Sequence, residues 1–134
     1  MSKTTATRAR PLSPHLQIYK PIPTMVMSIV HRITGVALYF GTLLVAIWLM
    51  AASGAPETFA RVQGIYSSWL GLIVLFGYTW TLIHHMIGGL RHLVMDTGAG
   101  MGKDESTKAA VAMPFISIAL TLIVWLVAFV ARGA

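Results

Sequence analysis

The amino-acid sequence predicts an all-α integral membrane protein with three transmembrane helices. Hydrophobic residues make up 56% of the 134 residues and charged residues only 10%, whereas about 25% of residues are charged in an ordinary soluble domain. The few charges lie at the ends of three long apolar runs, where signals for membrane topology occur. The formal net charge of +6 is not gathered into a patch with interleaved aromatic residues, so the sequence does not predict a nucleic-acid partner.

Residues 1–24 are expected to form a polar, proline-rich N-terminal arm. Residues 1–10 are basic, rich in serine and threonine and free of acids. Four prolines between residues 10 and 24 fix φ and remove hydrogen-bond donors, which predicts extended backbone there. Residues 25–134 form the predicted three-helix membrane domain, with spans over about 25–52, 62–92 and 109–131.

The first span contains an uncharged run of 20 residues from Ile33 to Ala52, which is long enough to cross a bilayer. Just before it, Ser28 and Arg32 lie one helical turn apart on the same face, with His31 beside Arg32. Two interpretations are open. His31 and Arg32 are interfacial anchors that snorkel to lipid headgroups, or Ser28 and Arg32 donate hydrogen bonds to a carbonyl or acidic ligand at the membrane surface.

The second span ends in the stretch LIHHMIGGLRHLVMD, from Leu82 to Asp96, and carries no formal charge from Val62 to Leu90. At 100° per residue, a first helical stripe contains Tyr78, Thr81, His85, Gly89, His92 and Asp96. A second stripe beside it contains His84, Gly88 and Arg91. Polar side chains are costly in lipid, so the continuous polar stripe is expected to face protein, water or a cofactor.

His85 is the best candidate for an axial haem ligand, because neutral imidazole binds haem iron and a flat porphyrin needs small residues beside it. It lies roughly 9 Å along the helix axis from Arg91, away from solvent. His92 lies about two turns away on the same face and cannot bind the same iron from the opposite side. If the iron has two histidine ligands, the second is therefore expected from another chain, within a heteromeric helix bundle. The alternative is that the histidines hydrogen-bond across the bundle and the glycines only permit close packing.

The third span, from Ala109 to Ala131, carries almost no polar chemistry and is expected to pack against partners. Lysine and arginine residues are concentrated before the first span and in the second loop, while the first loop holds only Arg61 and the tail only Arg132. The positive-inside rule then predicts a cytoplasmic N-terminus and a C-terminus across the membrane. The chain has no cysteine, so it cannot itself bind an iron–sulfur cluster through thiolates.

A resemblance to a known family lies in three stretches, RPLSPHLQIY, SIVHRITG and HHMIGGLRHLVMD. In this order and spacing they resemble the cytochrome b556 membrane-anchor subunits of succinate dehydrogenase, which is respiratory complex II. The resemblance runs from Arg10 to Asp96, and the three-span topology extends it to the end of the chain. The pattern S-x-x-H-R-x-T-G is met from Ser28 to Gly35, and the pattern H-x-x-x-G-x-R-H from His85 to His92.

The resemblance implies roles for individual residues. His85 matches the metal-binding position, the axial ligand of one haem b whose other ligand is a histidine of a second small anchor subunit. Ser28 and Arg32 match residues of the quinone site close to the iron–sulfur subunit, and His31 and Arg32 match positions near the haem propionates. His84 has no role in the motif and is treated as packing. For Asp96, proton delivery and an ion pair with Arg91 both stay open.

The implied function is electron transfer from succinate to ubiquinone in the tricarboxylic acid cycle and respiratory chain. A flavoprotein subunit oxidises succinate, an iron–sulfur subunit passes the electrons on, and this chain is an enzyme subunit without succinate chemistry of its own. The implied location is the bacterial inner membrane, with a periplasmic C-terminus. The mitochondrial inner membrane is the less favoured alternative. The alternatives are a quinol:fumarate reductase anchor, a non-enzymatic haem-binding adaptor, and a proton-relay subunit, which would need membrane-embedded acids that the long apolar runs lack.

Overall fold

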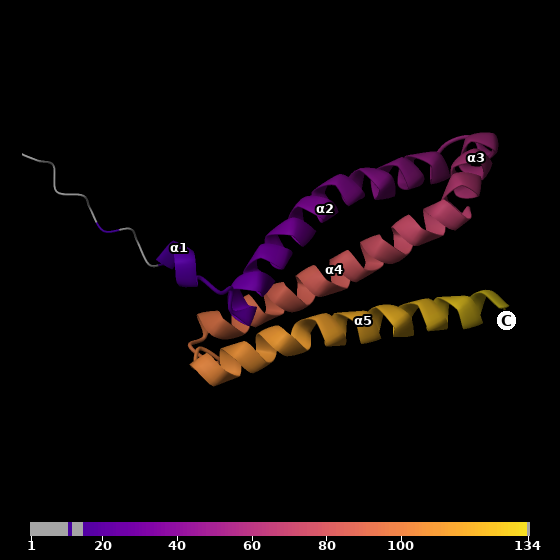
Figure 1. The fold of residues 1–134 in the computed structure, drawn as a ribbon. Coiled ribbons are helices and arrows are strands. Elements are labelled where there is room, and N and C mark those ends of the chain that lie inside the picture. The colour runs from indigo at the N-terminus through magenta and orange to yellow at the C-terminus, as the bar shows by residue number, and fades with distance from the viewer. Residues whose placement is uncertain (1–10, 12–14, 134) are drawn as a thin grey trace, which may run out of the picture.

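The computed structural model describes residue 11 and residues 15–133 (Figure 1). Within this part of the chain all regular structure is helical, in five helices: α1 (His15–Ile18), α2 (Pro23–Ala52), α3 (Pro56–Tyr66), α4 (Trp69–Asp96) and α5 (Lys103–Gly133). Three of them, α2, α4 and α5, are long and apolar enough to span a membrane. The prediction of an all-α membrane protein with three transmembrane helices is confirmed.

The N-terminal arm differs in one place from the expectation of extended backbone. Residues 1–10 and 12–14 lie outside the described residues. The helical turn α1 occupies His15–Ile18, where the extended prediction is wrong. The reason is local: no proline occurs from residue 15 to residue 20, so these residues keep the backbone donors that a helical turn requires.

The long apolar segment ahead of the histidines contains a turn that the sequence did not predict. The sequence places the start of the second span at about residue 62, whereas α4 begins at Trp69 and α3 ends at Tyr66. Ser68 caps α4, since its Oγ accepts a hydrogen bond from the backbone N–H of Gly71 at 3.2 Å. Gly71 also lies so close to the carbonyl oxygen of Ile65 that a Cβ would collide with it. The small residue permits this tight connection between α3 and α4.

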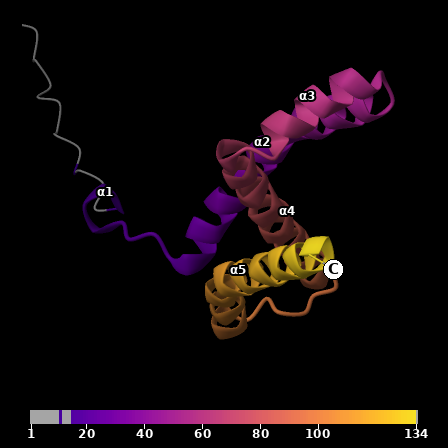
Figure 2. The ribbon, with the colours of Figure 1, turned by 90° about the vertical axis from the view of Figure 1, so that its right-hand side faces the viewer.

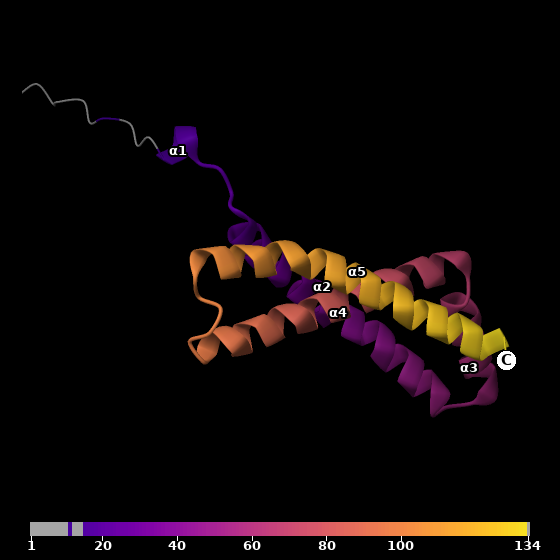
Figure 3. The ribbon, with the colours of Figure 1, turned by 90° about the horizontal axis from the view of Figure 1, so that it is seen from below.

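Helix α4 is central and packs against both α2 and α5. The end-on view places α4 between the other two long helices (Figure 2). Helices α2 and α4 are in contact and cross in the view from below (Figure 3), and α3 connects the end of α2 to the start of α4 (Figure 1). The α4–α5 loop lies at one end of the molecule, and α3 and the C-terminal end of α5 lie at the other (Figure 3). Gly98 and Gly100 give the loop its positive φ angles of 85° and 68°.

The buried interior is small and contains many polar side chains. Most large apolar residues of the three spans are exposed on the isolated chain, as expected for helices that face lipid or neighbouring subunits. The buried residues with polar side chains are Thr34, Thr81, His84, Ser117 and Thr121. They lie in the contacts of α4 with α2 and α5, and these two contacts define the site described next.

Candidate functional site

The imidazole of His85 lies in the contact between α2 and α4. Its Nδ1 atom is 3.1 Å from the carbonyl oxygen of His31 and 3.1 Å from Oγ1 of Thr34. The hydroxyl of Thr34 donates its own proton to the His31 carbonyl at 2.9 Å, so its oxygen is left as an acceptor. Both neighbours of Nδ1 are then acceptors, and Nδ1 carries the proton. The Nε2 atom keeps its lone pair, which is the form of imidazole that binds a metal.

The ring of His31 stacks on that of His85, with centroids 4.0 Å apart and planes inclined by 9°. Two glycines make room for this pair. Gly88 is buried, and a Cβ there would collide with the His31 ring, while a Cβ on Gly35 would lie 3.1 Å from Cε1 of His85. Gly89 is different, because a Cβ there would meet no atom within 4 Å. The two adjacent glycines therefore serve different purposes: Gly88 permits helix packing, and Gly89 leaves the surface beside His85 open.

His84 lies on the other side of α4, fully buried against α5. Its Nδ1 is 3.1 Å from Oγ of Ser117, and that hydroxyl donates its proton to the carbonyl of Pro114 at 2.9 Å. The Ser117 oxygen is the acceptor, so His84 is also protonated on Nδ1. The ring of Trp80, one turn earlier on α4, stacks on the His84 ring with centroids 5.2 Å apart.

This contact adds to the expectation for the third span. The sequence predicts a helix with almost no polar chemistry that packs against partners; α5 packs against α4 of its own chain, and its packing against partners stays a prediction. Its buried polar residues Ser117 and Thr121 face that contact. Near the loop, Arg91 donates a hydrogen bond of 2.6 Å to Oγ of Ser106. The Arg91 guanidinium is thus hydrogen-bonded to α5. This geometry gives no support to an ion pair between Arg91 and Asp96, which was one of the two roles left open for Asp96.

Ser28 and Arg32 lie on α2, and both are exposed. Together with Thr24, Met25 and Ile29 they line a surface depression of about 390 Å³. The structure brings His31, Thr34 and His85 into contact, and the exposed side chains of Ser28 and Arg32 lie within one turn of His31 on the same helix.

His92 is exposed, and its ring meets the His31 ring edge-on with centroids 5.3 Å apart. Sequence reasoning missed two partners in these contacts, Thr34 for His85 and Ser117 for His84. A signal for Thr34 exists, because a residue three positions after His31 lies on the same helix face. No local pattern indicates Ser117, since its position depends on how α5 packs.

The described residues contain no group of three or more histidine, cysteine, aspartate or glutamate side chains that could hold a bare metal ion. A single imidazole with a free Nε2 fits a different site, the axial position of a porphyrin iron, because the macrocycle supplies the in-plane nitrogen ligands. The hydrogen bond from Nδ1 to the His31 carbonyl is the usual orienting contact of such a ligand. The residues present therefore fit haem.

Residues 6–126 match the family of succinate dehydrogenase/fumarate reductase transmembrane subunits. The chain is 42% identical over 121 residues to the succinate dehydrogenase cytochrome b556 subunit of Paracoccus denitrificans, which covers 90% of this chain and 93% of that protein. It is 34% identical to the corresponding subunit of Rickettsia prowazekii (strain Madrid E), covering 87% and 90%. It is also 34% identical to the mitochondrial succinate dehydrogenase cytochrome b560 subunit of Sus scrofa, covering 81% and 66%.

Proposed function

The chain belongs to the family of succinate dehydrogenase/fumarate reductase transmembrane subunits, and from this premise we propose that it is the cytochrome b membrane anchor of a succinate:quinone oxidoreductase. The observation that carries the proposal is the state of His85: Nδ1–H is held by the His31 carbonyl, and Nε2 is left as a ligand. The relatives at 42% and 34% identity are named as succinate dehydrogenase subunits, which favours this direction over fumarate reduction.

His85 would bind the iron of haem b, and the bound haem supplies a one-electron redox centre. Thr34 and the His31 carbonyl orient the imidazole, and Gly89 leaves the adjoining surface open to a flat ring. His31 and Arg32 would lie toward the propionates. Among the other described histidines of the spans, His31 is stacked flat on the His85 ring, His84 is buried against α5 and His92 lies about two turns from His85. The second axial histidine would therefore come from the second small anchor subunit.

Ser28 and Arg32 would bind the quinone. Their side chains are exposed around one depression, and both supply hydrogen-bond donors. Donors placed at a quinone oxygen stabilise the negative charge that develops there as electrons arrive. The electrons would reach this surface from the iron–sulfur subunit, which receives them from the flavoprotein subunit. The positive-inside rule places this end of α2 on the cytoplasmic side of a bacterial inner membrane and the end of α5 on the periplasmic side.

The first experiment tests the haem assignment. The tagged chain is extracted from its native membrane in mild detergent, and a dithionite-reduced minus oxidised spectrum is recorded for the wild type and His85→Ala. We expect a b-type spectrum that is lost in the variant, with flavin- and iron–sulfur-bearing partners co-purifying with both. Haem without these partners would contradict the proposal. If the wild type co-purified with the same partners but showed no haem spectrum, the membrane-anchor role would stand and the assignment of His85 as a haem ligand would be wrong.

The second experiment tests the quinone assignment. Ser28→Ala and Arg32→Gln should each lower succinate–quinone reductase activity by about 100-fold, the typical cost of one donor at a developing oxyanion. Succinate oxidation with a water-soluble electron acceptor should not change, because that reaction bypasses the quinone. Thr42→Ala is the matched control: Thr42 is exposed on the same helix, and within the described residues its hydroxyl bonds only to the carbonyl of Leu38. Full quinone reductase activity in both variants would favour the non-enzymatic haem-binding adaptor.

A further inference from the structure

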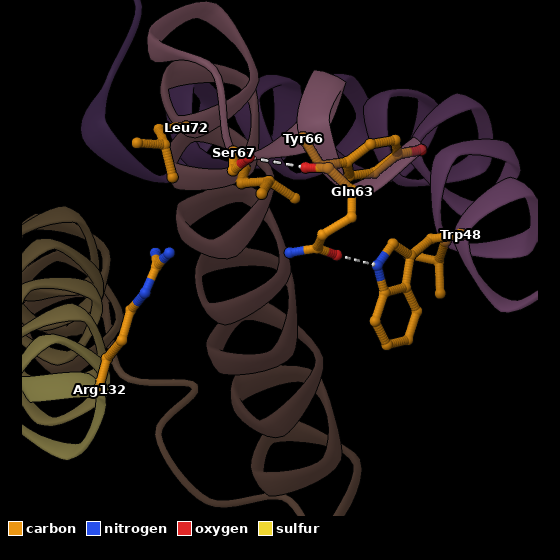
Figure 4. Close-up of a pocket in the computed structure, with 8 residues that line it drawn as sticks. Trp48, Gln63, Tyr66, Ser67, Leu72 and Arg132 are labelled. Atoms are coloured by element: carbon orange, nitrogen blue, oxygen red, sulfur yellow. Dashed lines mark hydrogen bonds between the residues drawn. The ribbon is translucent and has the colours of Figure 1, made fainter. Parts of the chain in front are cut away.

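A cavity lies at the end of the molecule that is distant from His85, where α3 meets the ends of the long helices. Its volume is about 350 Å³, and its lining comes from α2, α3, α4, α5 and the turn before α4 (Figure 4). Gln63 of α3 and Arg132 of α5 are the polar residues on which the following inference depends. Neither belongs to the haem or quinone surfaces.

The hydrogen bonds of the lining leave the Gln63 amide nitrogen free to donate to a ligand, while the Tyr66 and Ser67 hydroxyls have already given their protons to carbonyl oxygens. The indole N–H of Trp48 donates to Oε1 of Gln63 at 2.9 Å, so the Gln63 amide nitrogen has both its hydrogens available. The Tyr66 hydroxyl donates to the carbonyl of Leu44 at 2.7 Å, and the Ser67 hydroxyl donates to the carbonyl of Gln63 at 2.8 Å. Figure 4 shows the Gln63 amide nitrogen on the side of the cavity toward the Arg132 guanidinium. These two donor groups, the Gln63 amide and the Arg132 guanidinium, match an anion.

The position of the cavity indicates what carries that anion. Helix α3 is a short, polar and largely exposed helix between the ends of two spans, as expected for a segment lying at the membrane–water interface. Trp48, Tyr66 and Trp69 lie at the same end, in the manner of an interfacial aromatic belt. The wall that continues along α4 is apolar, formed by Leu72 and Leu75. A ligand here meets donors at headgroup level and apolar side chains below it.

We propose that this cavity binds an anionic phospholipid. Its phosphate accepts hydrogen bonds from Arg132 and from the Gln63 amide, and one acyl chain lies against Leu72 and Leu75. Free phosphate has the same charge chemistry but makes no use of the apolar wall. The inference is independent of the proposed function, because it involves neither haem nor quinone.

The test measures lipid binding to the purified complex. The tagged chain is extracted together with its partners, stripped of lipid in detergent, and titrated with phosphatidylglycerol, phosphatidylcholine or inorganic phosphate, with bound lipid counted by native mass spectrometry. Arg132→Gln should weaken phosphatidylglycerol binding by about fivefold, the value of one basic residue near an anionic lipid. Gln63→Glu should weaken it further, since the carboxylate still accepts from Trp48 but repels the phosphate.

Arg61→Gln is the matched control. Arg61 is exposed on α3 and does not line the cavity, so this variant should bind phosphatidylglycerol as the wild type does. If Arg61→Gln weakened phosphatidylglycerol binding as much as Arg132→Gln, the effect would come from general surface charge and the proposal would be overturned. If phosphatidylcholine bound as tightly as phosphatidylglycerol, and Arg132→Gln left this binding unchanged, the cavity would bind lipid through its apolar wall alone and the proposal would be overturned. Displacement of the lipid by inorganic phosphate would indicate a free-anion site. Because the readout is lipid mass, loss of haem or of succinate activity has no bearing on the result.

Discussion

The two faces of α4 place adjacent histidines in opposite situations. His84 faces α5, is fully buried, and bonds through Nδ1 to the side chain of Ser117. His85 faces α2, is partly exposed, and bonds through Nδ1 to the backbone carbonyl of His31. Both rings are protonated on Nδ1 and both keep a lone pair on Nε2. Nε2 of His84 is enclosed in the α4–α5 contact with no hydrogen-bond partner in the described chain, so only His85 can present its lone pair to a ligand outside the bundle.

The difference shows that residue type and protonation do not decide which histidine can bind a metal. A rotation of about 100° per residue turns neighbouring side chains toward different helices. The packing partner on each side then determines whether Nε2 is accessible. The predictions below test the two faces against each other, beginning with the largest expected effect.

The largest effect is expected from exchanging each imidazole for a ring without nitrogen. His85→Phe should lose the b-type difference spectrum completely, because the proposed ligand atom is gone. His84→Phe should keep it, since phenylalanine can still stack on Trp80, and the Ser117 hydroxyl retains its bond to the Pro114 carbonyl. The spectra of the two purified variants, normalised to protein, provide the measurement. A His84→Phe variant without haem would mean that both faces serve the cofactor.

The second effect concerns the adjacent glycines. Gly88→Ala should lower the free energy of unfolding by about 1–3 kcal/mol, the usual cost of overpacking, because the added methyl collides with the His31 ring. Gly89→Ala is its control and should not destabilise the chain, since the methyl enters open space. Thermal unfolding followed by circular dichroism in detergent compares the two variants. Equal losses of stability would contradict the distinction between a packing glycine and an open one.

The third effect isolates the buried pair on the α5 face. Ser117→Ala should cost about 1–3 kcal/mol, because Nδ1–H of His84 is left buried without an acceptor. Adding His84→Phe to Ser117→Ala should recover part of that loss, since no unpaired donor remains. The same unfolding measurement on the two single variants and the double variant gives the coupling between the residues. Additive losses would show that the His84–Ser117 hydrogen bond does not contribute.

The smallest effect is expected on the α2 face from Thr34→Val. The His31 carbonyl still accepts from Nδ1 of His85, so the ring keeps its tautomer and the spectrum should remain b-type. The affinity for haem should fall by about tenfold at most, the lower end of the cost of losing an orienting contact. Titration of the haem-stripped complex with hemin measures this affinity. Complete loss of haem would show that Thr34, rather than the backbone, holds the ligand.

Much of this arrangement could be predicted from local patterns. Long uncharged runs predict the spans, and the 100° periodicity separates the stripe of His85 from that of His84 before any contact is known. One expectation, the start of the second span, failed for lack of long-range information. The end of α3 and the turn after it lie inside what reads as one apolar segment from residue 62. The contact of α5 with α4 was not predicted because the few hydroxyl residues of α5 are spread along an aliphatic helix.

The sequence by itself determined the class of the protein and its three spans. These properties follow from composition and helical periodicity, which act over one segment at a time. Only the tertiary structure decided what each histidine meets: the His31 carbonyl and Thr34 for His85, and Ser117 for His84. These partners are 33 to 54 residues away along the chain, and a hydrogen bond across that separation depends on how the helices pack rather than on any local pattern.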